Sequence, residues 1–193
     1  MDRRQRKTRK LILEACNELL KSTDFHKLTI KQITERADIN RGTFYLHFED
    51  KFDMLESYEN ELIEKIFSII LEHFPEQFTK ELFVKTRYET IVNVFTVFAE
   101  NKSLLQFVLK AGHQSFQQKL HKMLKSIIEE KVLPHIDIEG AFPLDLLIAM
   151  FTSNFLTYAE YVYQTEESVD IEEAANFLFE LILYGPVKKF GLK

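Results

Sequence analysis

The sequence has few of the residues that make tight turns and only one that could form a disulfide. Five Gly and four Pro among 193 residues leave little scope for hairpins, and no apolar/polar alternation of period two is sustained. The single cysteine, Cys16, excludes an intramolecular disulfide and fits a reducing compartment. Glu14, Asn17 and Glu18 interrupt the first apolar segment, and no later run approaches a membrane span. We therefore expect an all-α protein of the cytoplasm.

The net charge of −5 is unevenly distributed. Residues 1–51 contain 12 Lys or Arg and 8 Asp or Glu, whereas residues 52–193 contain 13 and 22. Six of the basic residues lie between Arg3 and Lys10. A basic N-terminal part beside an acidic remainder suits a chain that presents one face to phosphates, although a run of charge is more often a solvated surface. We expect the segment 3–10 to contact phosphates or the minor groove of DNA.

Residues 29–51 have the pattern of two short helices around a tight turn. Thr29 and Gln32 have the spacing of a capping box, and Ile30, Ile33 and Ala37 recur at helical spacing. The segment 38–40 interrupts this pattern, and Asn40 can cap the second helix. The pattern predicts a helix-turn-helix, a shape whose usual role is to place its second helix in the major groove of DNA.

The second helix has a polar outer side. Phe44 and Phe48 lie four residues apart and point the same way. The hydrogen-bonding side chains expected to point away from the core are those of Arg41, Thr43, Tyr45 and His47. Arg41 can reach a guanine, and Thr43 can contact a base edge or a thymine methyl group, while Gly42 lets backbone come close to the bases. Phosphate contacts are expected from Thr29, Tyr45, His47 and Lys51. Alternatively, Tyr45 could pack on the first helix and His47 could cap a helix end.

This stretch resembles the DNA-binding domain of the TetR family of bacterial transcriptional regulators. The resemblance lies in RGTFYLHF at residues 41–48, which is similar to the family's recognition helix, and in Lys51, which would open the fourth helix. Asp38 stands where the family usually has a turn Gly, and Asn40 stands where it usually has Ser or Thr. Asp tolerates left-handed backbone and Asn caps well, so the motif is kept.

The resemblance implies an N-terminal three-helix domain, residues 1–51, joined by a long fourth helix to a helical effector-binding and dimerisation domain, residues 52–193. Apolar periodicity indicates that the fourth helix runs from Lys51 to His73, with Phe52 and Phe67 among its inward residues, and that a break follows at Gly112. Ile12, Ala15 and Cys16 form an apolar stripe on the first helix, so we expect Cys16 to be a buried structural thiol.

The last two helices are apolar over a wide arc, which a terminal helix of a small chain cannot easily bury within its own domain. A second copy of the chain can cover these helices, so we expect a homodimer through a four-helix contact, as the resemblance also implies. The expected interface residues are Leu146, Met150, Phe177, Leu178, Phe179, Leu181 and Ile182. Two reading helices related by a twofold axis predict an inverted-repeat operator in double-stranded DNA.

Aromatic residues are frequent, with 18 Phe and 7 Tyr, and several lie at helical spacing beyond residue 66. Such stripes are usually plain core, and composition alone cannot separate a core from an apolar ligand pocket. The resemblance implies a pocket for a small apolar or amphipathic effector. Asn154 interrupts an apolar stripe and is the candidate polar anchor, with a satisfied core Asn as the alternative. The expected lining is Phe67, Phe95, Phe98, Phe107, Phe116, Phe151, Asn154, Phe155 and Tyr158.

The sequence contains no recognisable catalytic or cofactor motif. The six histidines include no pair at i,i+4, there is no Gly-rich phosphate loop, and the one cysteine lies in the N-terminal stripe. We expect neither an enzyme nor a cofactor but a repressor released from its operator by the effector. Two alternatives remain open: a metal-sensing regulator in which His113 and His121 converge with a carboxylate, and an adaptor whose larger domain docks another protein.

Overall fold

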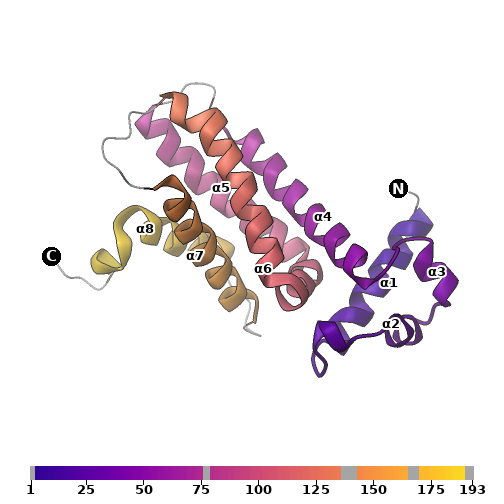
Figure 1. Cartoon of the computed structure of the whole chain (residues 1–193). Helices are drawn as coiled ribbons and strands as arrows, with labels where there is room; N and C mark the ends of the chain where they lie inside the picture. The colour runs from indigo at the N-terminus through magenta and orange to yellow at the C-terminus, as the bar shows by residue number, and fades with distance from the viewer. Residues whose placement is uncertain (1–2, 76–78, 136–142, 165–169, 190–193) are drawn as a thin grey trace. The chain divides into compact units, whose positions relative to one another are not determined.

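The structure, a computed structural model, describes residues 3–75, 79–135, 143–164 and 170–189, with the backbone alone at some positions inside helices. Every regular element in these ranges is helical, which confirms the all-α prediction. The α-helices are α1 (Arg3–Leu19), α2 (Ile30–Arg36), α3 (Arg41–Tyr45), α4 (Lys51–Glu72), α5 (Lys80–Glu100), α6 (Lys102–Ile127), α7 (Leu144–Gln164) and α8 (Ile171–Lys189), and the short turns are η1 (Phe25–Lys27), η2 (Ile128–Val132) and η3 (Leu133–His135) (Figure 1). Among the described helices, none combines the length and the apolar character that crossing a membrane requires.

The chain divides into two compact units. Unit 1 comprises Met1–Leu62 and Asn101–Phe116, and unit 2 comprises Ile63–Glu100 and Gln117–Lys193. Helices α4 and α6 each contribute residues to both units. The functional boundary expected after residue 51 stays a prediction.

The core of unit 1 holds α1, α2 and α3 around a row of aromatic rings. Ile12 and Cys16 of α1 are fully buried, as the apolar stripe predicts. The ring of Phe44 contacts that of Phe48, which contacts Tyr58, at centroid distances of 5.6 Å in both pairs. Burial of such rings provides most of the stabilisation that five-residue α3 cannot supply alone.

Helix α4 begins and ends within one residue of the predicted range, and its inward face is largely as expected. Leu55, Leu62 and Ile66 are buried. Two of the predicted inward residues are wrong: Phe52 is 52% exposed and Phe67 is 40% exposed. The ring of Phe52 instead lies edge-on to Phe25 at 5.8 Å, because a helix that packs on only one side leaves flanking apolar residues half in water.

The break predicted at Gly112 is a kink inside α6. Gly112 has non-helical dihedrals, φ −144° and ψ 34°, and the helix continues on both sides. A Cβ at this position would collide with the carboxylate of Glu59 and lie 2.9 Å from Ser115 Oγ. Glu59 is itself buried on α4 and accepts a hydrogen bond from the Ser115 hydroxyl. A residue with a side chain at this position would have to displace the side chains of Glu59, Ser115 and Leu55, which pack where α4 and α6 meet.

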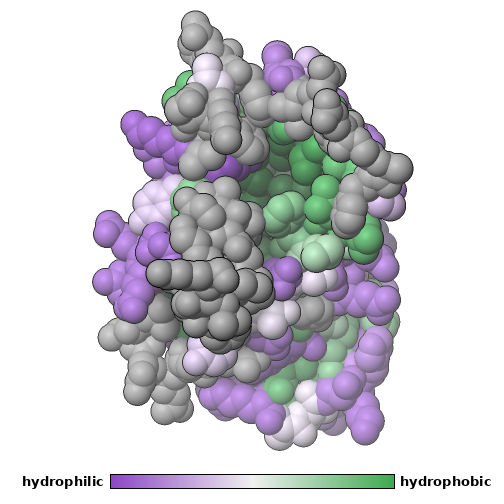
Figure 2. Space-filling model, turned by 90° about the vertical axis from the view of Figure 1, so that its left-hand side faces the viewer, coloured by the Kyte–Doolittle hydropathy of each residue, from purple (hydrophilic) through white to green (hydrophobic). Residues whose placement is uncertain are grey.

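In unit 2, α5 and α7 both pack against α8, and aromatic rings fill the space between them. Phe95 lies edge-on to Phe98, Phe155 and Tyr158, with centroids 5.6 to 6.2 Å apart. Tyr158 in turn stacks on Phe177 at 5.3 Å. Figure 2, which views the chain from the side where α8 lies in Figure 1, shows hydrophobic residues gathered in a hollowed strip of the surface.

Candidate nucleic-acid interface

Helix α2 begins at the capping box that the sequence predicts. Thr29 Oγ1 accepts from the backbone N–H of Gln32 at 3.2 Å, and Gln32 Oε1 accepts from the backbone N–H of Thr29 at 2.9 Å. The Thr29 hydroxyl also donates to Gln32 Oε1 at 2.8 Å. These bonds fix the start of α2 and use the hydroxyl proton that a phosphate contact by Thr29 would need.

The turn and the second cap also have the predicted form. Asp38 has φ 53°, in the left-handed region that Asp tolerates better than most residues. Asn40 then caps α3 by accepting from the backbone N–H of Thr43 at 2.7 Å, and the Thr43 hydroxyl donates to the same oxygen at 3.0 Å. Thr43 therefore keeps its methyl group and its acceptor lone pairs for a base, whereas its proton is already engaged.

The side of α3 opposite Phe44 is exposed. Arg41 and Gly42 are exposed, and Tyr45 is 54% exposed with its ring edge-on to Phe44. Leu46, the residue at the C-cap, is 83% exposed, which is the highest fraction among the exposed large hydrophobic residues. The interpretation of this face by hydrogen-bonding residues missed Leu46, although its helical position opposite Phe44 and Phe48 was a usable signal.

His47 lies half-buried at the end of this motif. Burial, and then the positive charge of Arg9, lowers its pKa. A His with a lowered pKa is neutral at pH 7, so it can make one neutral hydrogen bond to a phosphate but brings no fixed positive charge.

Lys51 Nζ has a structural position that the sequence interpretation missed. It donates to the carbonyl oxygens of Phe25, His26 and Leu28 at 3.0, 2.7 and 2.9 Å, and it lies 5.2 Å from the Phe52 ring centroid. An ammonium group has three N–H donors, and three carbonyls occupy them. Lys51 therefore has no N–H left to donate to a phosphate.

Arg9, in the basic segment 3–10, is likewise held inside unit 1. Its guanidinium lies 4.8 Å from the Phe48 ring centroid and 4.7 Å from that of Tyr58, and it donates to Ser57 Oγ at 3.2 Å. The Tyr58 hydroxyl donates to the Arg9 carbonyl at 2.6 Å, and burial raises the pKa of Tyr58. The first part of the basic segment, at Arg3, Arg4, Arg6 and Lys7, is exposed.

The structure brings together four of the residues expected to line an effector pocket. Phe95, Phe98, Phe155 and Tyr158 form the ring cluster of unit 2. Phe107 lies elsewhere, in unit 1, where its ring contacts Phe25 and Tyr58, and buried Phe116 also belongs to unit 1.

The remaining expected pocket residues lie at the surface of unit 2. Phe67 and Phe151 are each 40% exposed. Asn154 is exposed and donates to the Met150 carbonyl at 2.8 Å. Its role as a polar anchor stays a prediction.

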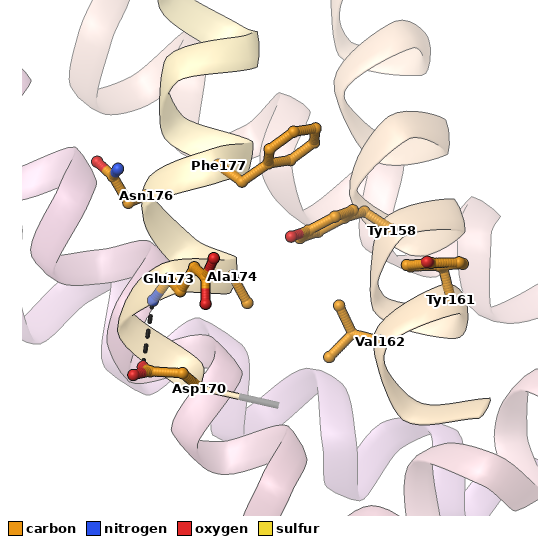
Figure 3. A pocket seen from close by; sticks show the side chains of 8 residues that line it. All are labelled: Tyr158, Tyr161, Val162, Asp170, Glu173, Ala174, Asn176 and Phe177. Carbon is orange, nitrogen blue, oxygen red and sulfur yellow. Dashed lines mark hydrogen bonds between the residues drawn. The ribbon is translucent and has the colours of Figure 1, made fainter. Parts of the chain in front are cut away.

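A cleft of about 290 Å³ opens between the end of α7 and the beginning of α8. Figure 3 shows the stacked rings of Tyr158 and Phe177 on one side of it, and Asp170 capping α8 by accepting from the backbone N–H of Glu173 at 3.2 Å. The cleft is lined by Tyr158, Tyr161, Val162, Asp170, Glu173, Ala174, Asn176 and Phe177. Of the residues expected in the pocket, it includes Tyr158 alone, so it adjoins the ring cluster without coinciding with the predicted pocket.

The residues expected at the dimer interface fall into two groups. Leu146, Met150 and Phe177 are 49%, 51% and 40% exposed, which leaves apolar surface available to a partner. Leu178 is fully buried and Phe179 packs edge-on against Tyr88 of α5, so both serve the interior of unit 2. Leu181 is half-buried, and the side chain of Ile182 lies outside the described residues.

The described residues contain no group of three His, Cys, Asp or Glu that could hold a metal ion. His121 Nε2 lies 3.7 Å from Asp145 Oδ1, and the same carboxylate oxygen lies 2.7 Å from Lys125 Nζ. The side chain of His113, the other expected ligand, lies outside the described part of the chain.

The caps, the left-handed turn and the exposed face of α3 together define a helix-turn-helix protein of the all-α class. Residues 12–58 match the family model described as bacterial regulatory proteins, tetR family. The N-terminal part of the chain therefore carries a DNA-binding domain of the tetR type.

Proteins of Bacillus subtilis (strain 168) are among the relatives. The uncharacterized HTH-type transcriptional regulator YxbF is 26% identical over 176 residues, which cover 89% of this chain and 43% of the relative. The fatty acid metabolism regulator protein is 23% identical over 187 residues, covering 90% of this chain and 93% of the relative. The chain spans less than half the length of the first two curated relatives, 43% in each case.

The fold of the chain is shared with solved structures of regulators. The transcriptional regulator FadR from Bacillus subtilis, in complex with stearoyl-CoA, matches with a TM-score of 0.62 and 20% identity, over 91% of this chain and 97% of that chain. These relatives are regulators and not enzymes, as the sequence predicts.

Proposed function

We propose that this chain is a dimeric transcriptional repressor that binds an inverted-repeat operator through α3 and leaves it when an amphipathic effector binds unit 2. The observation that carries the proposal is the outward face of α3. Arg41, Gly42, Tyr45 and Leu46 are exposed on this face, and Thr43 is half-buried. Capped helix starts and the buried rings of Phe44 and Phe48 hold the helix in place. Such a helix is rigid on its inner side and open to a duplex on its outer side.

Arg41 is the base-reading residue in this proposal, through its bidentate fork to a guanine. Tyr45 and His47 make phosphate contacts, and Gly42 and Thr43 allow the helix to approach the bases closely. Five residues of helix contact too few base pairs for selective binding, so two copies are required. Half-site centres on the order of 34–36 Å apart are the simplest geometry for a twofold-related pair.

The proposed homodimer forms through the exposed apolar residues of α7 and α8. Replacing Met150 by Glu is expected to give monomers in analytical ultracentrifugation and to abolish cooperative operator binding, because a charge would be buried in the contact. Leu71→Glu is the matched control, since Leu71 is 39% exposed on α4. A Met150→Glu protein that remains dimeric would place the interface elsewhere.

The effector class follows from the relatives. A fatty acid metabolism regulator aligns over 90% of this chain, and the FadR neighbour is in complex with stearoyl-CoA. We propose a long acyl chain as the effector of this chain. Because Phe95 and Phe98 are fully buried against one another, an acyl chain could enter the ring cluster only by displacing rings, and that coupling of binding to conformation is what a switch requires.

The switch itself is proposed to act through α4 and α6, which are the helices that contribute to both units. Couplings of this kind amount to about 1–3 kcal/mol, which corresponds to roughly 5- to 150-fold in operator affinity. Such a change in operator affinity is large enough to release the chain from its operator and so free the promoter.

The deciding experiment is a gel shift against the DNA upstream of the chain's own gene, repeated across a salt series. A regulator with six or more phosphate contacts should lose about a thousandfold in affinity between 50 and 200 mM salt. Stearoyl-CoA should then release the DNA, whereas coenzyme A alone should not. Binding that is weak and indifferent to sequence would favour the adaptor alternative, and release by divalent metal in place of the acyl compound would favour the metal-sensing one.

A further inference from the structure

Leu46 is the most exposed of the large apolar side chains that the structure describes in unit 1. Its backbone N–H donates to the Gly42 carbonyl at 3.1 Å, and its dihedrals, φ −72° and ψ −15°, are helical, so the geometry of α3 extends to it. At roughly 100° per residue, Leu46 lies about 180° from the mean direction of Phe44 and Phe48. The two rings that anchor α3 therefore direct Leu46 straight outward.

The turn before Leu46 leaves room for a close approach. Gly42 lies four residues earlier on the same face, is exposed, and has no side chain that could hold a duplex away. The side-chain oxygen of Asn40, at the start of α3, accepts hydrogen bonds from the backbone N–H and the hydroxyl of Thr43. The part of α3 that lies opposite Phe44 and Phe48 consequently consists of the backbone of Gly42 and the side chain of Leu46.

Leu46 is 83% exposed at the outer edge of α3, so it would be covered when α3 enters a groove. Covering phosphates or base donors and acceptors with a leucine would remove their water without supplying a hydrogen bond, whereas covering an apolar group is favourable. The floor of the major groove offers one such group, the 5-methyl group of thymine. Resting on the proposed DNA binding, we infer that Leu46 reads a thymine in each half-site by contacting its 5-methyl group.

The test uses the full chain and removes the methyl group alone. The operator is first selected from a pool of random duplexes, and each thymine is then replaced by deoxyuridine at equivalent positions of both half-sites. Fluorescence anisotropy gives the Kd of each duplex for the parent, Leu46→Ala and Leu71→Ala. Both substituted leucines are exposed, so neither change removes a core side chain.

The parent is expected to lose affinity roughly fourfold for each methyl removed at one position per half-site, the size expected for burying one CH₂-sized group. Leu46→Ala should bind the thymine and deoxyuridine duplexes equally, and Leu71→Ala should behave as the parent does. The inference is overturned if every deoxyuridine duplex binds the parent within twofold of the original, or if Leu46→Ala keeps the same methyl dependence. A parent that selects no sequence would instead refute the proposed function, and the inference with it.

Discussion

Replacing Lys51 by Met is expected to destabilise unit 1 while leaving the salt dependence of DNA binding unchanged. The ammonium group converges on the carbonyls of Phe25, His26 and Leu28 at the end of η1, and it lies 5.3 Å from the Phe25 ring centroid. Met keeps an unbranched apolar stem of similar length, so the substitution removes the charge and the three donors and little of the packing.

The expected loss can be estimated from these three hydrogen bonds. A typical protein hydrogen bond contributes about 1 kcal/mol net, which gives about 3 kcal/mol for three bonds. The bond to His26 is exposed, so water can replace the ammonium there, and the expected loss falls to about 2 kcal/mol. Bonds to a charged donor are stronger than average, which makes this figure conservative.

Urea unfolding followed by circular dichroism measures the loss directly. Lys31→Met is the matched control, because the Lys31 side chain is 63% exposed and pairs with Glu35 one turn away, at 3.7 Å. The control should change the free energy of unfolding by less than about 0.5 kcal/mol. The same two variants are then titrated with operator DNA across a salt series.

The opposite pattern would refute this reasoning. If Lys51→Met unfolds with the parental free energy, and the slope of log K against log salt becomes shallower by about 0.9 per protomer, then Lys51 contacts a phosphate. The three carbonyls would in that case be satisfied by water, and the expectation from the sequence would stand.

Three further predictions concern single residues. Arg41→Ala should weaken specific operator binding by about 1–3 kcal/mol and relax preference at one base pair, which selection from random duplexes would reveal; unchanged discrimination would exclude the base-reading role. Asp38→Gly should raise the free energy of unfolding in urea by about 0.5–1 kcal/mol, because Gly adopts φ 53° at no steric cost, whereas Asp38→Val should lower it. Burial raises the pKa of Cys16 from 9.0 to about 12. The folded chain thus holds this proton longer than the unfolded chain, so stability should be unaffected below about pH 9 and should fall by up to about 1.4 kcal/mol per pH unit above it. Cys16→Ala should lack that part of the decline.

Local chemistry made the helix-turn-helix predictable from the sequence. The caps at Thr29 and Asn40 and the left-handed turn at Asp38 each involve residues within four positions of one another, and the structure confirms all three. Burial of Cys16 followed from helical periodicity in the same way. Interactions of this range are encoded in spacing, which a sequence displays directly.

The positions of Arg9 and Lys51 could not be read from spacing. Arg9 meets Ser57 across 48 residues, and Lys51 meets the carbonyl of Phe25 across 26. A basic residue next to a DNA-binding motif suggests a phosphate contact by default. The fold shows instead that the charge of Arg9 lies against two aromatic rings and that the charge of Lys51 lies against three carbonyl oxygens. The expected pocket residues do not all lie together for a related reason. Phe107 lies at helical spacing as Phe95 does, but Phe107 belongs to unit 1 and Phe95 to unit 2.

Electrostatics alone is therefore a smaller part of the proposed DNA binding than the excess of positive charge in residues 1–51 suggests. Arg9 and Lys51 are engaged within unit 1, Arg36 pairs with Glu18, and His47 has a lowered pKa. The charged groups that stay exposed include the basic start of α1, Lys21 and Lys27. The other proposed phosphate contacts, by Tyr45, His47 and the backbone N–H groups near the ends of short helices, carry no full positive charge. Fewer charged contacts make the non-specific affinity lower at a given salt concentration, so discrimination between sequences depends more on what α3 does at the base edges. A reading face made of one arginine fork and one outward leucine would then determine where this chain binds.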